Sequence, residues 1–194
     1  MAMTGASGAA YGLRLIQRLA NAGIKQHLLF SDAARVVLKQ ELDLSLPEAT
    51  ESVAAAIASH LDISVELLNH YHQTDWFSPA ASGSAGIRHM VVIPCSMGSL
   101  ARIAGGISDN LIERAADVML KERGNLILVP RETPLSSIHL EHMLKLSQMG
   151  VDLIPAMPGF YHRPESIDEL VDFLVDRVMD HLHIDDGGAK RWGD

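Results

Sequence analysis

Two short segments rich in glycine and serine hold the residues of this chain best suited to binding an anion. Residues 3–12 read MTGASGAAYG, and residues 95–99 read CSMGS. Each precedes a run of helical periodicity, so its hydroxyls and backbone N–H groups should lie at a helix N-terminus, which suits phosphate oxygens or a polar ring edge. The spacing of Gly5, Gly8 and Gly12 is not that of the dinucleotide fingerprint, and no Gly-Lys-Ser/Thr follows, so neither standard phosphate loop is predicted.

Short apolar runs alternate with helical patterns along the rest of the chain. The expected strands precede Gly5 and cover residues 25–31, 90–95, 125–130 and 151–156. The expected helices cover residues 13–20, ending at Gly23, then 33–41, 97–105, 109–123 and 136–149, with a last helix opening at Pro164. Residues 48–72 begin as a helix and are ambiguous afterwards, and residues 78–86 read as a loop. The alternation predicts a three-layer Rossmann-like (flavodoxin-like) α/β fold, with a parallel sheet and helices on both faces.

The predicted sheet gathers the polar segments at one rim, because ligands of open parallel sheets bind beyond the carboxyl ends of the strands. The segments that follow the strands are Gly5 with Ala6 and Ser7, then Ser31, CSMGS at 95–99, PRETP at 130–134 and PGFYHRP at 158–164. Taken alone, the first of them has an equally good structural interpretation, a tight turn with Ser7 near a helix N-cap.

Composition limits the class of protein. The chain has 194 residues, 47% of them hydrophobic, so we expect a single domain over residues 1–194 with a loosely packed tail from about residue 184. A net charge of -8 disfavours binding to nucleic acid or to an anionic membrane. One cysteine and no apolar run near the ~20 residues of a bilayer span favour a cytoplasmic protein. Most of the strand expected before Gly5 is missing from the sequence.

Seven motifs occur in order along nearly the whole chain. They are MTGASG, DW with PAASGSAG, PCSMGSLARIA, DNLIERAADVMLKER, LVPRETPLSSIHLEHMLKLSQMG, PGFYHRP and the terminal RWG. Together they resemble the UbiX-type flavin prenyltransferases, and the block at residues 109–150 is the most distinctive part. The resemblance implies an enzyme that joins a dimethylallyl group from dimethylallyl phosphate to N5 and C6 of reduced FMN. Its product, prenylated FMN, would serve UbiD-type decarboxylases, as in ubiquinone biosynthesis.

The resemblance also implies site residues and an assembly. The FMN-binding positions would be Gly5, Ala6, Ser7, Ser31, Ser96, Met97, Gly98, Ser99 and Arg131. The prenyl-phosphate positions would be Tyr161 and Arg177, with Arg114, Lys121 and Glu132 completing the phosphate pocket and Trp76 forming an aromatic wall. Catalysis would rest on Glu132, Ser7 and Trp76. Family members form homo-oligomers, often dodecamers, in which neighbouring subunits complete the phosphate pocket.

Physical chemistry is compatible with these roles. A phosphate monoester leaves poorly unless its charge is compensated, and the Asp-Asp pair at 185–186 lies in a Gly-rich tail, so the sequence predicts a metal-independent reaction driven by Arg and Lys. Glu132 could act as acid, as base, or as both at different steps. An allylic fragment that develops positive charge would be stabilised over Trp76 by about 0.5 to 2 kcal/mol.

Other interpretations remain open. Arg114 and Lys121 could belong to a solvated helix face, Trp76 could be a packing residue, Tyr161 could close a loop and Arg177 could pair with a neighbouring aspartate. Cys95 is expected to be a buried structural thiol, and the histidine spacings match no metal motif. Two other functions are an FMN-dependent decarboxylase of the same superfamily, whose Pro-x-Met-Asn motif lacks its Asn here at residues 155–158, and a flavodoxin-like electron carrier.

Overall fold

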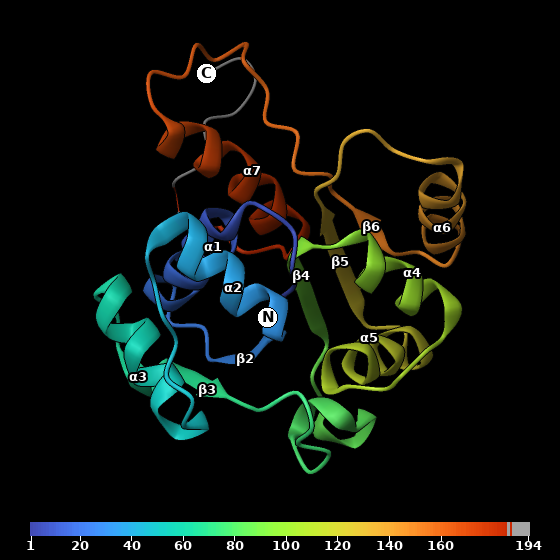
Figure 1. Cartoon of the computed structure of the whole chain (residues 1–194), viewed down its shortest axis with the longest axis horizontal. Coiled ribbons are helices and arrows are strands. Elements are labelled where there is room, and N and C mark those ends of the chain that lie inside the picture. The colour runs from blue at the N-terminus through green and yellow to red at the C-terminus, as the bar shows by residue number, and fades with distance from the viewer. Residues whose placement is uncertain (186, 188–194) are drawn as a thin grey trace.

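The computed structural model describes residues 1–185 and residue 187; the RWG motif and Asp186 lie outside them. Its strands are β1 (Ala2–Met3), β2 (Gln26–Phe30), β3 (Leu68–His70), β4 (His89–Cys95), β5 (Asn125–Pro130) and β6 (Asp152–Leu153). They form a six-stranded sheet in the order β3-β2-β1-β4-β5-β6, with every pairing parallel (Figure 1). The order changes direction between β1 and β4, which is where open sheets of this kind bind ligands. The predicted Rossmann-like parallel sheet is therefore confirmed.

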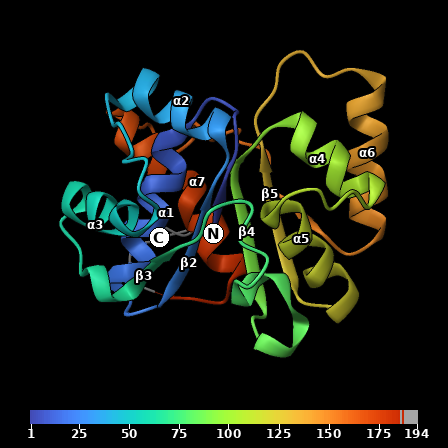
Figure 2. The same ribbon diagram turned by 60° about the horizontal axis from the view of Figure 1, so that its bottom comes forward.

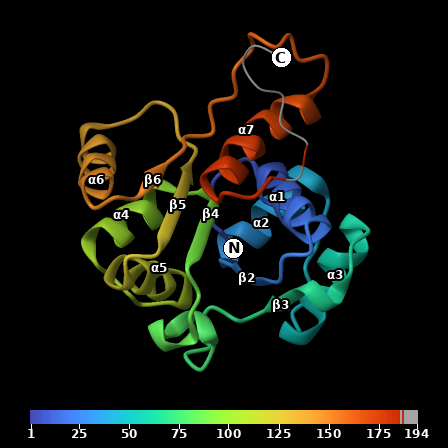
Figure 3. The ribbon, with the colours of Figure 1, turned by 180° about the vertical axis from the view of Figure 1, so that it is seen from behind.

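Helices cover both faces of the sheet (Figures 2 and 3). They are α1 (Ala9–Asn21), α2 (Asp32–Leu42), α3 (Thr50–Leu61), α4 (Met97–Gly105), α5 (Leu111–Glu122), α6 (Ser137–Gln148) and α7 (Ile167–His181). One face packs α1 and α7 against alternate residues of β4 such as Val91 and Ile93, and the other packs α4 and α5 against Met90 and Val92. Alternation along β4 thus fills both cores, as expected for a strand buried on both sides.

Three elements differ from the sequence-based prediction. β3 lies in the stretch that the sequence left ambiguous, because an edge strand of three residues carries little periodic signal. β6 ends at Leu153 rather than Ala156, although Ile154 N and Ala156 N still donate to Leu128 O and Pro130 O of β5, both at 2.9 Å. α7 begins at Ile167, three residues after Pro164, because Ser166 is the N-cap and its side chain accepts from Glu169 N at 3.2 Å.

β1 is short yet occupies the centre of the sheet. Ala2 pairs with β2 on one side and β4 on the other. The Met1 ammonium donates to His27 O at 2.9 Å, and Leu29 N donates to Met1 O at 3.0 Å, so the ladder with β2 continues through Met1. In the described part of the chain, none of the helices is long and apolar enough to cross a membrane.

Candidate active site

Backbone hydrogen bonds hold the loops after the central strands together at one rim. Ser31 N donates to Met3 O at 3.1 Å, and Arg131 N donates to Cys95 O at 3.3 Å. Ser96 N donates to the Thr4 hydroxyl at 2.7 Å. The rim therefore brings together the residues predicted to hold a flavin. They are Gly5, Ala6, Ser7, Ser31, Ser96, Met97, Gly98, Ser99 and Arg131.

Glycines set the shape of the first loop. Gly8 has φ 110° and is the N-cap of α1, so Ser7 is not the cap. A Cβ on Gly5 would lie 2.4 Å from Ala33 Cβ, which shows how closely this loop passes the first turn of α2. The Ser7 side chain is exposed beside this turn. The loop thus presents a hydroxyl at the rim while its backbone packs against α2.

Glu41, near the end of α2, is a site residue that sequence reasoning missed. Its carboxylate accepts from Gly8 N at 2.9 Å and from Ala9 N at 2.8 Å. These are first-turn amides of α1, which have no acceptor within their own helix. A carboxylate of the protein therefore occupies one of the two anion sites that the sequence predicted. The position of Glu41 in the sequence gives no indication of this contact.

The carboxyl of Glu41 is held in its ionised form. Burial opposes ionisation, but hydrogen bonds from the Ser7 hydroxyl and from the Ala9 and Gly8 amides, together with the nearby charge of Arg131, lower its pKa below the usual value. Ser7 and Glu41 thus lie close together at the rim. Such a pair can orient a hydroxyl and accept a proton from it.

The second anion site, at the N-terminus of α4, is open to a ligand. Ser96 is the N-cap: its hydroxyl accepts from Ser99 N at 3.2 Å and donates to the Ser99 hydroxyl at 3.0 Å. Gly98 is exposed, and a Cβ there would meet no atom closer than Ser96 Oγ at 4.0 Å. The first turn of α4 can therefore present backbone N–H groups to phosphate oxygens.

Arg131 supplies a cation to the same rim. Its Nε is buried and has no hydrogen-bond partner within the protein. A buried guanidinium donor without a partner is costly, and an anionic ligand would satisfy it. The adjacent Glu132 is exposed, and its carboxylate accepts from Thr133 N at 3.1 Å. The rim thus fits a phosphorylated ligand, with Arg131 and the first turn of α4 for its phosphate.

Thr4 connects the two loops. It is 2% exposed, and its hydroxyl donates to Pro94 O at 3.1 Å while accepting from Ser96 N. Replacing Thr4 by valine should lower the free energy of unfolding by about 1 to 3 kcal/mol, because Ser96 N loses its acceptor in a buried position. Urea unfolding measures the loss, and Thr4→Ser, which keeps the hydroxyl, should recover most of it. A valine variant as stable as the parent would show that this bond does not hold the loops.

Comparison with known proteins assigns the family. Residues 1–179 match the flavoprotein family. The sequence is 48% identical to flavin prenyltransferase UbiX of Pseudomonas aeruginosa over 100% of this chain and 93% of that protein. The chain belongs to the UbiX-type flavoproteins. A dodecameric FMN-dependent UbiX-like decarboxylase from Escherichia coli O157:H7 superposes with TM-score 0.87 at 41% identity, covering 100% of this chain and 97% of that one. AnUbiX, solved in complex with FMN and dimethylallyl pyrophosphate, superposes with a TM-score of 0.88 at 39% identity, covering 100% of this chain and 95% of that one.

Two of the residues predicted to complete the phosphate pocket, Arg114 and Lys121, lie on α5, away from the rim. Lys121 ion-pairs with Glu122, just before β5 begins, and therefore lies near the amino ends of the strands. Arg114 Nε donates to Ala81 O at 3.1 Å and its Nη1 contacts Asp117 at 2.7 Å. Within one chain, the structure does not bring these two cations to Arg131.

Of the other three predicted positions, Arg177 and Tyr161 lie along α7, away from the rim. α7 runs alongside α1 in the same direction, because Arg14 pairs with Asp168 at its start and Arg18 with Asp176 further on. Arg177 follows Asp176 and so lies near the end of α1 that points away from the rim. Tyr161 packs against Phe173 of α7, with ring centroids 5.6 Å apart. Trp76 is 48% exposed, in the loop that follows β3.

Cys95 and the histidines were the remaining candidates for nucleophilic or metal chemistry. Cys95 is buried at the end of β4, and burial raises the pKa of its thiol to about 12. It is therefore protonated at neutral pH and unreactive, as expected for a structural thiol. The described residues include no group of three or more His, Cys, Asp or Glu side chains arranged to hold a metal ion.

Proposed function

We propose that this chain is a flavin prenyltransferase that joins a dimethylallyl group from dimethylallyl phosphate to N5 and C6 of reduced FMN. The observation that carries the proposal is the rim itself, which gathers Arg131, whose buried Nε has no partner in the protein, and the neighbouring side chains of Ser7 and Glu41. The first provides charge for a phosphate, and the second provides proton transfer. Membership of the UbiX-type flavoproteins and the FMN complex of AnUbiX support it.

The flavin ring, when bound, supplies the electron-rich N5 and C6 atoms that become alkylated. The loop 5–7 and Ser31 would line one side of the flavin, and Ser96 to Ser99 with Arg131 would hold its phosphate. Ser7 would orient the ring edge, and Glu41 would take the proton that Ser7 relays. Positioning of the two reactants should be the larger contribution, because oriented reactants avoid much of the entropic cost.

A second copy of the chain completes the site in this proposal. Arg114 and Lys121 are held on α5 and Tyr161 packs on α7, so these side chains, with Arg177 of α7, lie away from a ligand held at the rim of the same chain. An assembly could place these groups over the rim of a neighbour, where Glu132 is exposed to meet them. The dodecameric E. coli relative supports a homo-oligomer, and we propose a dodecamer here too. The leaving phosphate would then be neutralised by cations of two chains without a metal.

The decisive experiment is anaerobic. Reduced FMN and dimethylallyl phosphate are incubated with the protein and EDTA, and the molecular mass of the extracted flavin is measured. We expect the mass to rise by one prenyl unit. Unmodified FMN recovered from folded, flavin-loaded protein would contradict the proposal. Since the E. coli relative is described as a decarboxylase, a parallel reaction with an aromatic acid and no prenyl donor tests that second function by release of CO2.

The wider setting follows the same reasoning. Prenylated FMN is a cofactor, so a UbiD-type decarboxylase would consume it, for example in ubiquinone biosynthesis. A cytoplasmic location agrees with the single cysteine of the sequence. The purified product should restore the activity of an apo-decarboxylase of the UbiD type. An apo-decarboxylase that stays inactive after addition of the adduct would contradict this role.

A further inference from the structure

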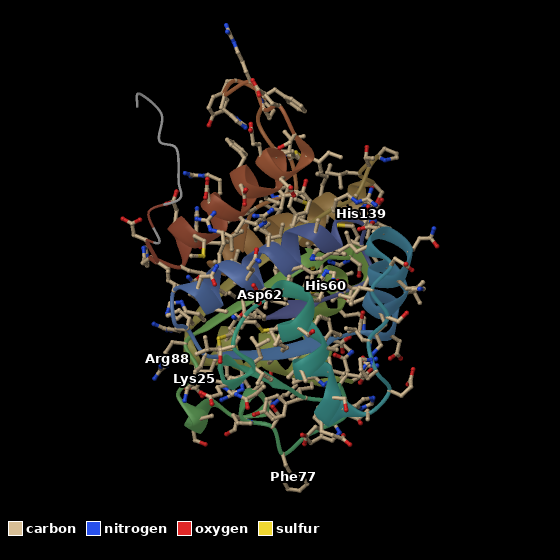
Figure 4. The ribbon with its side chains drawn as sticks, turned by 90° about the vertical axis from the view of Figure 1, so that its left-hand side faces the viewer. Lys25, His60, Asp62, Phe77, Arg88 and His139 are labelled. Atoms are coloured by element: carbon tan, nitrogen blue, oxygen red, sulfur yellow. The ribbon has the colours of Figure 1, made fainter. Side chains whose placement is uncertain are left out.

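The segment between β6 and α7 carries Tyr161, and it projects from the body of the subunit (Figures 1 and 4). Phe160 and Tyr161 within it are 69% and 62% exposed. Large exposed side chains on a loop ordinarily sample several rotamers, and fixing one of them costs entropy. A side chain that has to meet a ligand on a neighbouring subunit therefore needs a support within its own chain.

Three aromatic rings form this support. The His162 ring stacks on Phe173 of α7, with centroids 5.1 Å apart and planes 3° from parallel. The Tyr161 ring stands across the stack, 5.7 Å from the His162 centroid and 5.6 Å from that of Phe173, at interplanar angles of 81° and 79°. Stacked and edge-to-face pairs at such distances are favourable. We call Tyr161, His162 and Phe173 the aromatic cluster, and it fixes the plane of the Tyr161 ring.

The backbone bends sharply to bring these rings together. Arg163 N donates to Phe160 O at 3.0 Å, and Arg163 has φ 55°, a left-handed conformation that costs free energy in a residue other than glycine. A Cβ on Gly159 would lie 2.9 Å from the Tyr161 ring, so the chain passes directly against the cluster. Such a turn persists only where other contacts hold it, and His162 makes one of these contacts with α7.

His162 is held by the faces of its ring and not by its nitrogens. Nδ1 and Nε2 are both buried, and neither has a hydrogen-bond partner within the protein. The carboxylates of Glu169, Asp172 and Asp176 line a cavity of about 300 Å³ that His162 also lines, yet none of them accepts from its ring. A buried polar atom without a partner costs free energy, so a phenyl ring could make the same stack without this cost.

We propose that His162 is a positioning residue: through its stack on Phe173 it holds Tyr161 in the orientation that binds the phosphate of the prenyl donor. This role rests on the proposed function, which assigns Tyr161 to that phosphate. His162 acts through Tyr161 and needs no contact of its own with the donor or the flavin. A ring that is fixed before the donor arrives loses little entropy on binding.

A double-mutant cycle in the full protein tests this role, with FMN saturating and dimethylallyl phosphate varied. Tyr161→Phe removes the hydroxyl, and kcat/KM for the donor should fall about 10-fold or more, as expected for a hydrogen bond to a charged group. His162→Ala should cause a similar fall, mainly through KM for the donor, with the affinity for FMN unchanged. In the Tyr161→Phe background the same alanine substitution should cost less than about 2-fold, because the hydroxyl that it displaces is already absent.

Two further variants separate positioning from folding. His162→Phe keeps a flat ring for the stack and should retain at least about half of the parent's kcat/KM. His60→Ala removes an exposed histidine near the end of α3, away from this segment (Figure 4), and should turn over like the parent. Flavin content is recorded for every protein. Should His162→Ala lose its flavin, His162→Leu, which fills the space without a flat ring, takes its place in the cycle.

The outcomes distinguish the role of His162 from the function itself. Losses that add fully in the double variant would overturn the role, and so would a His162→Phe variant as impaired as His162→Ala. Parent-like kcat/KM in His162→Ala would overturn it as well. A parent protein that forms no adduct would instead overturn the proposed function, and the role of His162 with it.

Discussion

Replacing Glu41 by glutamine should slow prenylation of FMN by about 100-fold or more, while flavin binding changes little. Glutamine keeps an oxygen that can accept from the amides of Gly8 and Ala9, so the start of α1 should retain its cap. It cannot accept a proton relayed by Ser7, and positioned acid-base groups contribute about 10² to 10⁴ in rate. Single-turnover formation of the adduct, followed by mass, measures the effect.

The control for this variant is Glu48→Gln, which removes an exposed carboxylate in the segment between α2 and α3. It should leave the rate unchanged. Flavin occupancy is recorded for each protein, so a slow variant without flavin is separated from a slow variant with flavin. An unchanged rate in flavin-loaded Glu41→Gln would remove Glu41 from the chemistry and leave it only the role of a helix cap.

Replacing Arg131 by glutamine should weaken FMN binding by about 10- to 150-fold, the equivalent of one charge-assisted hydrogen bond of about 1.5 to 3 kcal/mol. The guanidinium has a buried Nε without a partner in the protein, so a ligand is its natural acceptor. Quenching of flavin fluorescence during titration measures the dissociation constant.

Riboflavin, which has no phosphate, distinguishes the contact that Arg131 makes. If Arg131 holds the phosphate, its replacement should leave the affinity for riboflavin unchanged. An equal loss for FMN and riboflavin would place Arg131 against the ring instead. Lys145→Gln, at an exposed position on α6, is the charge-matched control and should bind both ligands normally.

Elements with strong periodic patterns were predictable from the sequence. β5 has the predicted bounds, and α4 and α5 agree within two residues, because each combines an apolar run with clear terminal residues. The short edge elements were not. β3 and β6 depend on pairing with a longer neighbour, and their own side chains carry little information about it.

The residues of the rim were predictable from the sequence, but the hydrogen bonds between them were not. Gly5, Ser96 and Arg131 follow strands, so topology alone places them together. Thr4 and Glu41 act through contacts between segments far apart in sequence: Thr4 reaches position 96, and Glu41 reaches positions 8 and 9. No spacing rule encodes such contacts, because they arise only when the loops pack. The prenyl-phosphate residues stay predictions, since their proposed partners belong to another chain.

The parallel run of α7 beside α1 keeps Arg177 at the far end of the subunit from the flavin rim. Flavin capture and donor activation should therefore respond differently to dilution. Below the concentration at which the subunits of the proposed assembly separate, each chain should still bind one equivalent of FMN. Turnover per chain should fall in proportion to the fraction of chains that remain in contact with another subunit. A tether between two chains that restores proximity should restore turnover without altering flavin affinity.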